Sequence, residues 1–230
     1  MSGDNGCLYI VATPIGNLKD ITLRALDTLR EVDTIACEDT RHTLKLLNAY
    51  SISKRLLSCR SGNEEKAAER IISILREGKN VAYASDAGTP GVSDPGSRLV
   101  RMVRDAGFDI VPMPGPSAFA ALVSVGAFAG KAVIFEGFLS PKPGKRRKRL
   151  KELLERQDAV VIYESPFRII KLLTDIADLF PDREILIGRE MTKIHEEFLE
   201  GTANEVLEIL NNREKVKGEF SVLVSGKKKS

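Results

Sequence analysis

The sequence predicts two α/β domains, the first built on a mainly parallel, doubly wound sheet and the second on a mixed sheet. In the first half, short apolar runs alternate with stretches in which apolar residues recur at helical spacing. A Pro-Gly-Pro segment at residues 114–116 interrupts this alternation. In the second half, two strand-like runs follow each other without a helix between them, which indicates antiparallel pairing. We therefore place the domains at residues 1–115 and 116–230.

Each expected strand of the first half ends in a polar loop, and a helix follows most of these loops. The strands are expected at residues 8–13, 34–37, 56–59, 81–85 and 108–113. The helices between them are expected at residues 23–32, 43–50, 64–77 and 97–107. Thr22 is a natural cap for the first helix, and Asp39 or Thr40 for the second. This regular alternation favours a parallel sheet with helices on both faces.

In the second half, the expected strands and helices do not alternate regularly. Its strands are expected at residues 132–138, 159–163, 184–188, 196–199 and 220–224. A small apolar helix at 118–125, a basic helix ending at 156, a helix ending at 179 and a helix at 203–211 complete it. The strands at 184–188 and 196–199 have no crossover helix between them, so they are expected to pair antiparallel.

The most informative stretch is the loop between the strand at 81–85 and the helix that begins at residue 97. It contains three glycines, two prolines and two acids, and it is longer than most strand-to-helix connections. Glycine lets the backbone approach a ligand closely, and proline restricts the shape of the loop. Open α/β sheets bind ligands at the carboxyl ends of their strands. The loop is therefore predicted to bind a ligand, the alternative being a well-ordered connector.

Composition excludes several classes of protein. The chain has 230 residues, 43% of them hydrophobic, and no apolar run approaches the roughly 20 residues of a membrane span. The polar N-terminus lacks a signal-peptide pattern, and Cys7, Cys37 and Cys59 are odd in number and widely spaced. These features favour a cytoplasmic protein with free thiols. His42 and His195 have no other histidine or cysteine at ligand spacing, so no metal centre is expected.

The positive charge is concentrated in one place. Seven basic residues and no acid lie between Lys142 and Lys151, although the net charge of the chain is only +3. Clustered cations of this kind bind phosphates, which predicts an RNA contact. The alternative is a solvated helix face. No aromatic residue lies within this run, so base stacking is expected from elsewhere. The central residues of the predicted contact are Lys145, Arg146, Arg147, Lys148 and Arg149.

Eight segments, in order along nearly the whole chain, form a specific pattern: TPIGNLKDIT (13–22), CEDTRHT (37–43), SDAGTPGVSDPG (85–96), PGPSA (114–118), FEGFL (135–139), YESPFR (163–168), REMTKIHEEF (189–198) and KGEFSVLV (217–224). Together they resemble the ribosomal RNA small subunit methyltransferase I family, in the tetrapyrrole-methylase-like class of S-adenosylmethionine enzymes. One departure is Phe167, where the family motif more usually has histidine. A histidine role at that position is therefore not essential here.

The resemblance implies two α/β domains with S-adenosylmethionine in the cleft between them, and a homodimer. It implies methyl transfer to the ribose 2′-hydroxyl of a cytidine in the decoding region of small-subunit rRNA. Asp86 has an alternative role in fixing its own loop through backbone N–H groups. The cofactor contacts carried over from the family are Asp86, Ala87, Gly88, Val92, Ser93, Asp94, Ser117, Ala118, Tyr163, Glu164, Glu219 and Phe220.

The demanding step of such a reaction is removal of a proton from a ribose hydroxyl, which is a very weak acid. A general base is expected to contribute about 10²–10⁴-fold. The candidates are Glu38, Asp39, Glu190 and Lys193, and each has the alternative of a structural ion pair. A lysine base requires a lowered pKa. Arg41 and Arg189 are candidates for holding phosphates of the acceptor strand.

Two other functions remain open from the sequence. One is methylation of a tetrapyrrole or other small molecule, which the basic helix and the REMTKIHEEF segment disfavour. The other is an RNA-binding ribosome-assembly module that retains a vestigial cofactor cleft. Cofactor binding separates this module from the two enzymes, and dependence of methyl transfer on RNA separates the enzymes from each other.

Overall fold

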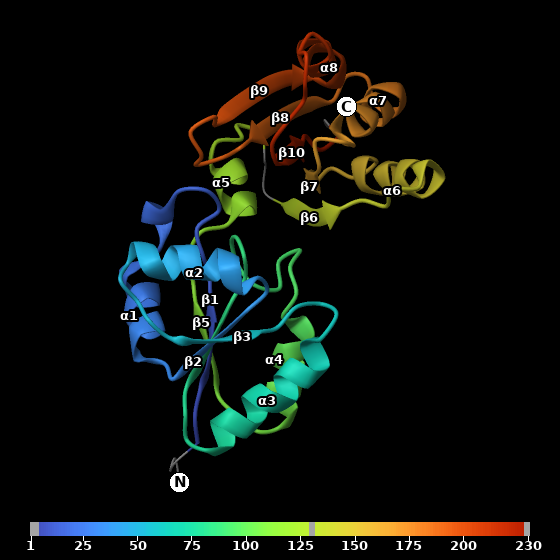
Figure 1. Cartoon of the computed structure of the whole chain (residues 1–230). Helices are drawn as coiled ribbons and strands as arrows, with labels where there is room; N and C mark the ends of the chain where they lie inside the picture. The colour runs from blue at the N-terminus through green and yellow to red at the C-terminus, as the bar shows by residue number, and fades with distance from the viewer. Residues whose placement is uncertain (1–4, 129–131, 228–230) are drawn as a thin grey trace. The chain divides into compact units, whose positions relative to one another are not determined.

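The computed structural model describes residues 5–128 and 132–227, and it divides into two compact units, Met1–Ser117 and Ala118–Ser230 (Figure 1). Each unit contains its own five-stranded sheet and its own hydrophobic core. Within the described ranges, no helix has both the length and the apolar character that crossing a bilayer requires.

The sheet of the first unit has the strand order β3-β2-β4-β1-β5, and all neighbouring strands are parallel. The prediction of a parallel sheet in the first half is confirmed. Every strand is short, and β2 and β4 are buried along their whole length because helices cover both faces. The strands are β1 (Leu8–Val11), β2 (Thr34–Cys37), β3 (Arg55–Ser58), β4 (Val81–Ala84) and β5 (Ile110–Met113).

The helices of the first unit are divided between the two faces of the sheet. Alternate residues of β4 show the division: Val81 and Tyr83 pack with α3 and α4, whereas Ala82 packs with α1 and α2. The neighbouring strands β1 and β4 are therefore followed by helices on opposite faces, which opens a crevice at their carboxyl ends. The helices are α1 (Leu23–Glu31), α2 (Thr40–Ala49), α3 (Glu64–Arg76) and α4 (Ser97–Asp105).

The sheet of the second unit has the order β6-β7-β10-β8-β9. Only β6 and β7 are parallel, and the consecutive strands β8 and β9 pair antiparallel, as the sequence predicted. The strands are β6 (Val133–Phe138), β7 (Ala159–Glu164), β8 (Glu184–Arg189), β9 (Glu197–Thr202) and β10 (Phe220–Val224). The helices are α5 (Ala118–Ser124), α6 (Pro143–Leu154), α7 (Ile169–Leu179) and α8 (Ala203–Asn211).

The helices of the second unit also cover both faces. Apolar side chains of α6, α7 and α8 form one core with alternate residues of the sheet, including Val222. The intervening residue of β10, Leu223, faces the other way and lies against Gly126, just beyond α5. The central strands β7, β8 and β10 are therefore buried on both sides, which explains their nearly continuous apolar sequences, whereas the edge strand β9 is not buried.

Of the boundaries that differ from the sequence prediction, two have a clear local reason. Helix α2 begins at Thr40 and not at Thr43, because the Asp39 carboxylate accepts the Arg41 N–H at 2.9 Å and caps the helix three residues earlier. Strand β9 continues to Thr202, whose hydroxyl and Glu205 form a capping box that starts α8.

Candidate active site

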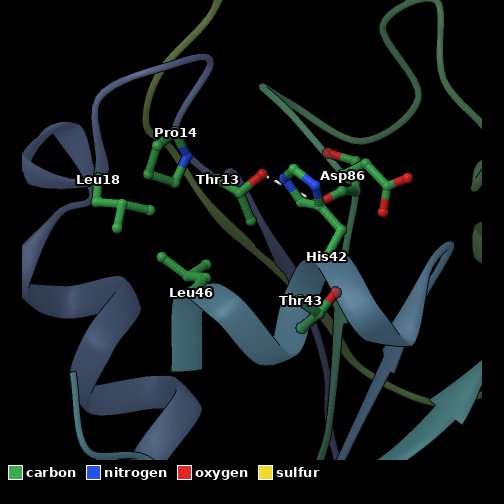
Figure 2. A pocket seen from close by; sticks show the side chains of 8 residues that line it. Thr13, Pro14, Leu18, His42, Thr43, Leu46 and Asp86 are labelled. Carbon is green, nitrogen blue, oxygen red and sulfur yellow. Dashed lines mark hydrogen bonds between the residues drawn. The ribbon is translucent and has the colours of Figure 1, made fainter. Parts of the chain in front are cut away.

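The loops that follow β1 and β4 are tied to each other at the carboxyl edge of the first sheet. Thr13 and Gly88 exchange two backbone hydrogen bonds of 2.9 Å each, and the Thr13 hydroxyl donates to the Ser85 carbonyl at 3.0 Å. Gly88 has a φ of +81°, which favours glycine at this position. Figure 2 shows that Thr13, Asp86 and His42, from three different segments, border one narrow pocket. These hydrogen bonds therefore fix the loop after β1 and the loop after β4 relative to each other.

The far end of the long loop is held by a helix on the α3–α4 face of the sheet. One carboxylate oxygen of Glu64, in α3, accepts the N–H groups of Gly96, Arg98 and Leu99, each at 3.1 Å. These are the otherwise unsatisfied donors of the first turn of α4. Gly96 has a φ of +124°, and a Cβ there would lie 2.7 Å from the Tyr83 ring. The loop therefore closes tightly over Tyr83 before α4 begins.

Three carboxylates gather between these anchors: Glu38 at the end of β2, and Asp86 and Asp94 in the long loop. Burial, together with the charges of Asp94 and Asp86, raises the pKa of Glu38 to about 7. Burial and the charge of Asp86 raise the pKa of Asp94 to about 6. Across the described residues, none of the three forms an ion pair. The cluster is therefore an electronegative site whose carboxylates are not paired with a described cation, although Arg41 and Arg60 line the adjoining cavity.

The electronegative cluster suits the cofactor that the sequence predicted. S-adenosylmethionine carries a positive sulfonium and a positive ammonium, and both gain energy from nearby carboxylates in a partly buried site. A cavity beside the cluster is lined by three acids and two arginines, together with two hydroxyl side chains: Glu38, Asp39, Asp86, Arg41, Arg60, Thr40 and Ser58. Of the predicted cofactor residues, Asp86, Ala87, Gly88, Val92, Ser93 and Asp94 share the long loop. Ser117 follows Pro116, whose carbonyl accepts the Thr89 hydroxyl at 3.1 Å, and Ala118 begins α5.

Asp86 does not fix its own turn, which was the alternative role. Its Oδ1 accepts the backbone N–H of Asp39 at 3.0 Å and so links the end of β4 to the end of β2. Asp39 itself caps α2, and its carboxylate takes two hydrogen bonds from the Arg41 guanidinium, at 3.1 and 2.7 Å. These bonds hold the pKa of Asp39 far below its ordinary value. Asp39 is thus a weak base, although the exposed Arg41 remains accessible to an anion.

Glu190 and Lys193 form a structural ion pair in the loop between β8 and β9. The Lys193 ammonium donates to Glu190 at 2.9 Å and to Glu219 at 3.1 Å. Burial is the largest single influence and lowers the pKa of Lys193, but the two carboxylates outweigh it and raise that pKa. This disfavours Lys193 as a catalytic base, because such a base requires a lowered pKa.

Glu190 is also a poor candidate for the base. Burial alone would raise its pKa, but the hydrogen bonds from Lys193 and from the Glu219 N–H lower it overall. Arg189 donates to the Lys217 carbonyl at 2.8 Å and to Glu197 at 3.2 Å, so this guanidinium is engaged inside the protein. Arg189, Glu190 and Lys193 therefore bind the segment that precedes β10, through Lys217 and Glu219.

The remaining predicted cofactor residues lie in the second unit, where β7 ends and the antiparallel strand β10 begins. Phe220 pairs in register with Glu164, and both are buried. One oxygen of Glu164 binds Arg168 and the Ser165 N–H, both at 2.7 Å, and the other has no partner among the described residues. The Tyr163 ring packs edge-on against Phe135 at 5.0 Å. Glu219 is exposed apart from its bond to Lys193.

The basic run does not present all of its charges to solvent. Arg146 is only 4% exposed, and its Nε donates to Asp175 of α7 at 2.6 Å. The prediction that Arg146 contacts RNA is therefore wrong, because its guanidinium belongs to a buried ion pair. Arg147 binds Asp175 and Asp178, and Arg149 binds Glu136 and Glu152. The exposed cations of α6 and its N-cap that have no ion pair in the described ranges are Lys142, Lys145, Lys148 and Lys151.

Sequence reasoning did not find two residues that shape the site. Glu64 reads as an ordinary acid in the first turn of α3, and only the tertiary structure brings it to the start of α4. Tyr83 reads as a core residue of β4. Its hydroxyl is buried without a partner among the described residues, and burial followed by the charges of Cys59 and Glu38 raises its pKa. No local pattern marks either residue.

The fold is that of known methyltransferases. The structure aligns with the methyltransferase CobJ with a TM-score of 0.73 and 20% identity, over 98% of this chain and 97% of that one. It aligns with uroporphyrin III C-methyl transferase from Thermus thermophilus with a TM-score of 0.66 and 17% identity, over 95% of this chain and 97% of that one. At these identities the likeness shows the fold alone.

Similarity of sequence is much closer to another group. A protein of Borrelia garinii subsp. bavariensis is 51% identical, over 95% of this chain and 98% of its own length. A protein of Thermotoga maritima is 48% identical, over 96% and 99%. Both are named ribosomal RNA small subunit methyltransferase I, and residues 7–207 match the family model of the tetrapyrrole (corrin/porphyrin) methylases. The chain therefore belongs to the tetrapyrrole (corrin/porphyrin) methylase family, in its ribosomal RNA small subunit methyltransferase I group.

Proposed function

We propose that this protein is an S-adenosylmethionine-dependent methyltransferase that modifies small-subunit rRNA at the ribose 2′-hydroxyl of a cytidine in the decoding region. The observation that carries the proposal is the end-to-end similarity to relatives named for methylation of this RNA, at up to 51% identity. The carboxylate cluster at the edge of the first sheet supports it, because the cluster suits a cationic cofactor.

The cofactor supplies an activated methyl group on a good leaving group, so the protein mainly orients the acceptor and excludes water. Asp86 and Asp94 hold negative charge beside the cationic cofactor. Gly88 and Gly91, with φ of +81° each, allow the loop backbone to approach it. Tyr163, at the end of β7, packs edge-on against Phe135 and Phe138, and this aromatic group suits contact with a nucleoside.

Glu38 is the proposed general base. With a pKa of about 7 it is ionised in an appreciable fraction of molecules at neutral pH, yet it is more basic than an ordinary carboxylate. Its position at the end of β2, beside Asp86 and Asp94, places it in the same cluster as the proposed cofactor contacts. The other three candidates have a depressed carboxylate pKa or a stabilised ammonium.

The proposed RNA contact on α6 consists of lysines. Lys145 and Lys148 are exposed, and no carboxylate in the described ranges neutralises them. Phosphate binding by such lysines releases counterions, so affinity should fall steeply with salt. Arg41 is a further phosphate contact, since its side chain is 88% exposed while it binds Asp39.

The experiment that tests this function is methyl transfer from labelled S-adenosylmethionine to small ribosomal subunits that lack the modification. Nuclease mapping should place the label on one ribose in the decoding region. Cofactor binding without transfer to subunits or naked rRNA would assign another acceptor, such as a small molecule. An absence of cofactor binding would leave an RNA-binding assembly module as the better account.

Three further features belong to the proposal. The protein is a homodimer, so light scattering should give twice the chain mass of 25.3 kDa. It works in the cytoplasm, where its ribosomal substrate is assembled. Displacement at a sulfonium methyl group needs no metal ion, so activity should survive treatment with a chelator.

A further inference from the structure

The turn that follows β7 exposes an aromatic ring. The Phe167 side chain is 89% exposed, although phenylalanine is among the residues most often buried. A pocket adjoins the ring and is lined by Pro166, Phe167 and the segment Lys215–Gly218. An exposed ring at the wall of a pocket is a site where something else is expected to pack.

The two segments that form this pocket meet because of the sheet topology. Strand β7 ends where the antiparallel strand β10 begins, with Glu164 opposite Phe220. The turn after β7 and the segment before β10 therefore share one edge of the sheet. Strand β8 ends at the same edge, since Arg189 is also opposite Phe220.

Hydrogen bonds from the end of β8 and the loop after it hold the segment Lys215–Gly218 in place. The Arg189 guanidinium donates to the Lys217 carbonyl at 2.8 Å, and Glu190 exchanges hydrogen bonds with the N–H and C=O groups of Glu219. Gly218 has a φ of +101°, and a Cβ there would lie 2.5 Å from Glu190. The segment that carries the two lysines is therefore fixed before any partner arrives.

The turn that carries Phe167 is fixed in the same way. Arg168 pairs with the buried Glu164 at 2.7 Å and donates to the Leu139 carbonyl at 3.3 Å. Its backbone N–H also donates to the Ser165 carbonyl at 3.0 Å. With its neighbours anchored on the protein, Phe167 is the side chain of this turn that remains outside.

The charges around the ring favour a polyanion. Lys215 and Lys217 line the pocket, and neither forms an ion pair with any residue that the structure describes. Of the nearby acids, Glu219 binds Lys193, and Glu190 binds Lys193 and the Glu219 N–H. Glu214 is exposed and forms no ion pair with a residue that the structure describes. An aromatic face flanked by free ammonium groups is the arrangement that binds unpaired nucleotides, because every base has a π-face and every linkage a phosphate.

We propose that this pocket binds an unpaired nucleotide of the RNA substrate, with the base stacked on Phe167 and the flanking phosphates on Lys215 and Lys217. The inference rests on the proposed function for the identity of the RNA. It supplies the base stacking that the basic helix, which lacks an aromatic residue, does not offer. It also explains why the Phe167 ring is exposed to solvent and not packed in the core.

The test is binding of a fluorescent single-stranded RNA oligonucleotide and of its duplex to the full-length protein. Phe167→Leu keeps the apolar volume but removes the π-face, so it should weaken single-strand binding about tenfold and leave duplex binding unchanged. Phe167→Tyr should retain wild-type affinity. Lys215→Gln with Lys217→Gln should lower the slope of log affinity against log salt by about 1.4. Leu23→Ala, at an exposed leucine of the first unit, is the matched control.

Equal single-strand affinity of wild type and Phe167→Leu would overturn the proposal. So would an equal loss in Leu23→Ala, because the effect would then be one of general surface hydrophobicity. If Phe167→Leu fails to fold, Phe167→Met takes its place: it also lacks a π-face, so the same loss of single-strand affinity is expected and an unchanged affinity would overturn the proposal. Methyl transfer to subunits is measured separately, so a failed methyltransferase assay with an intact Phe167 effect would overturn the proposed function and not this site.

Discussion

Glu38 and Asp39 are adjacent in the sequence, but their environments shift the pKa values of their carboxylates in opposite directions. The Glu38 side chain is partly buried beside two other acids, whereas Asp39 caps a helix and binds Arg41. Burial and like charges favour the protonated form, while hydrogen bonds to the carboxylate favour the ionised form. The result is a pKa of about 7 for Glu38 and a strongly depressed pKa for Asp39.

The first prediction concerns the base. The methyl-transfer rate of the wild type should rise with pH through about 7 and then level off, because Glu38 must be ionised to accept a proton. Glu38→Gln should lower kcat by about 10²–10⁴-fold and abolish this rise. Asp39→Asn, which keeps the helix cap, is the control and should retain most of the activity. An unchanged pH profile in Glu38→Gln would remove Glu38 from the mechanism.

The same carboxylates make stability depend on pH. Glu38 and Asp94 have folded-state pKa values of about 7 and 6, above the ordinary values of 4.5 and 3.8. Between the ordinary and the folded values the native state holds more protons than the unfolded state, so the free energy of unfolding falls as pH rises from about 4 to 7. Above pH 7 the full destabilisation is present.

The second prediction follows from this sign. Glu38→Gln with Asp94→Asn should raise the free energy of unfolding at pH 8 by about 1–3 kcal/mol and leave it nearly unchanged at pH 4. Urea denaturation at the two pH values measures the difference. Equal effects at both values would mean that the carboxylates are not destabilising when ionised.

At the scale of the element, α6 separates its arginines from its lysines. Arg146, Arg147 and Arg149 pair with acids of α7, β6 and α6 itself, whereas Lys145 and Lys148 have no ion pair in the residues described. The guanidinium fork suits fixed, bidentate pairing, and the flexible ammonium suits a solvated phosphate. One helix therefore carries both a structural face and a binding face.

The third prediction tests this separation. Arg146→Ala should destabilise the protein by about 2–4 kcal/mol, because Asp175 keeps its charge in a buried position. Lys145→Gln with Lys148→Gln should change stability by less than about 0.5 kcal/mol and lower the salt slope of RNA binding by about 1.4. Thermal unfolding and salt titrations measure the two effects. A loss of RNA affinity in stable Arg146→Ala protein would return Arg146 to the interface.

The behaviour of α6 also shows where the sequence stops being informative. Its basic run contains no acid, so the linear pattern indicates an open cationic surface. Apart from Glu152, three positions after Arg149, the acids that neutralise it are residues 136, 175 and 178, which only the tertiary fold brings near. By contrast, the antiparallel pairing of β8 with β9 was predictable, because it follows from the short connection between them.

At the scale of the whole molecule, the chain has two units with separate cores. One sheet is wholly parallel and the other is mixed. The alternation of strands and helices predicted the first, and two consecutive strands without a helix between them predicted the second. The contacts across each sheet edge, such as Glu64 with the start of α4, have no sequence signal, since they join residues more than 30 positions apart. The fold was therefore more predictable than the detailed geometry of the site.

The fourth prediction concerns the independence of the two cores. Leu153→Ala, at a buried position of the second unit, should cost about 2–5 kcal/mol and speed amide exchange in residues 133–224 only. Leu29→Ala, in a core of the first unit, should do the same for residues 8–113. Hydrogen exchange followed by mass spectrometry measures the exchange rates in both variants. Faster exchange throughout the chain in either variant would show that the units unfold as one.

The loop after β4 is fastened at two points, by the Thr13–Gly88 backbone pair and by the Glu64 carboxylate. Residues 89–95 lie between these two attachment points and include the proposed cofactor contacts Val92, Ser93 and Asp94, so a substitution there should alter the binding site without moving the sheet beneath it. Protein engineers can use the same property. A loop taken from a distant relative should graft cleanly when Gly88, Gly96 and Glu64 are kept together, so new donor or acceptor preferences can be explored on an existing frame.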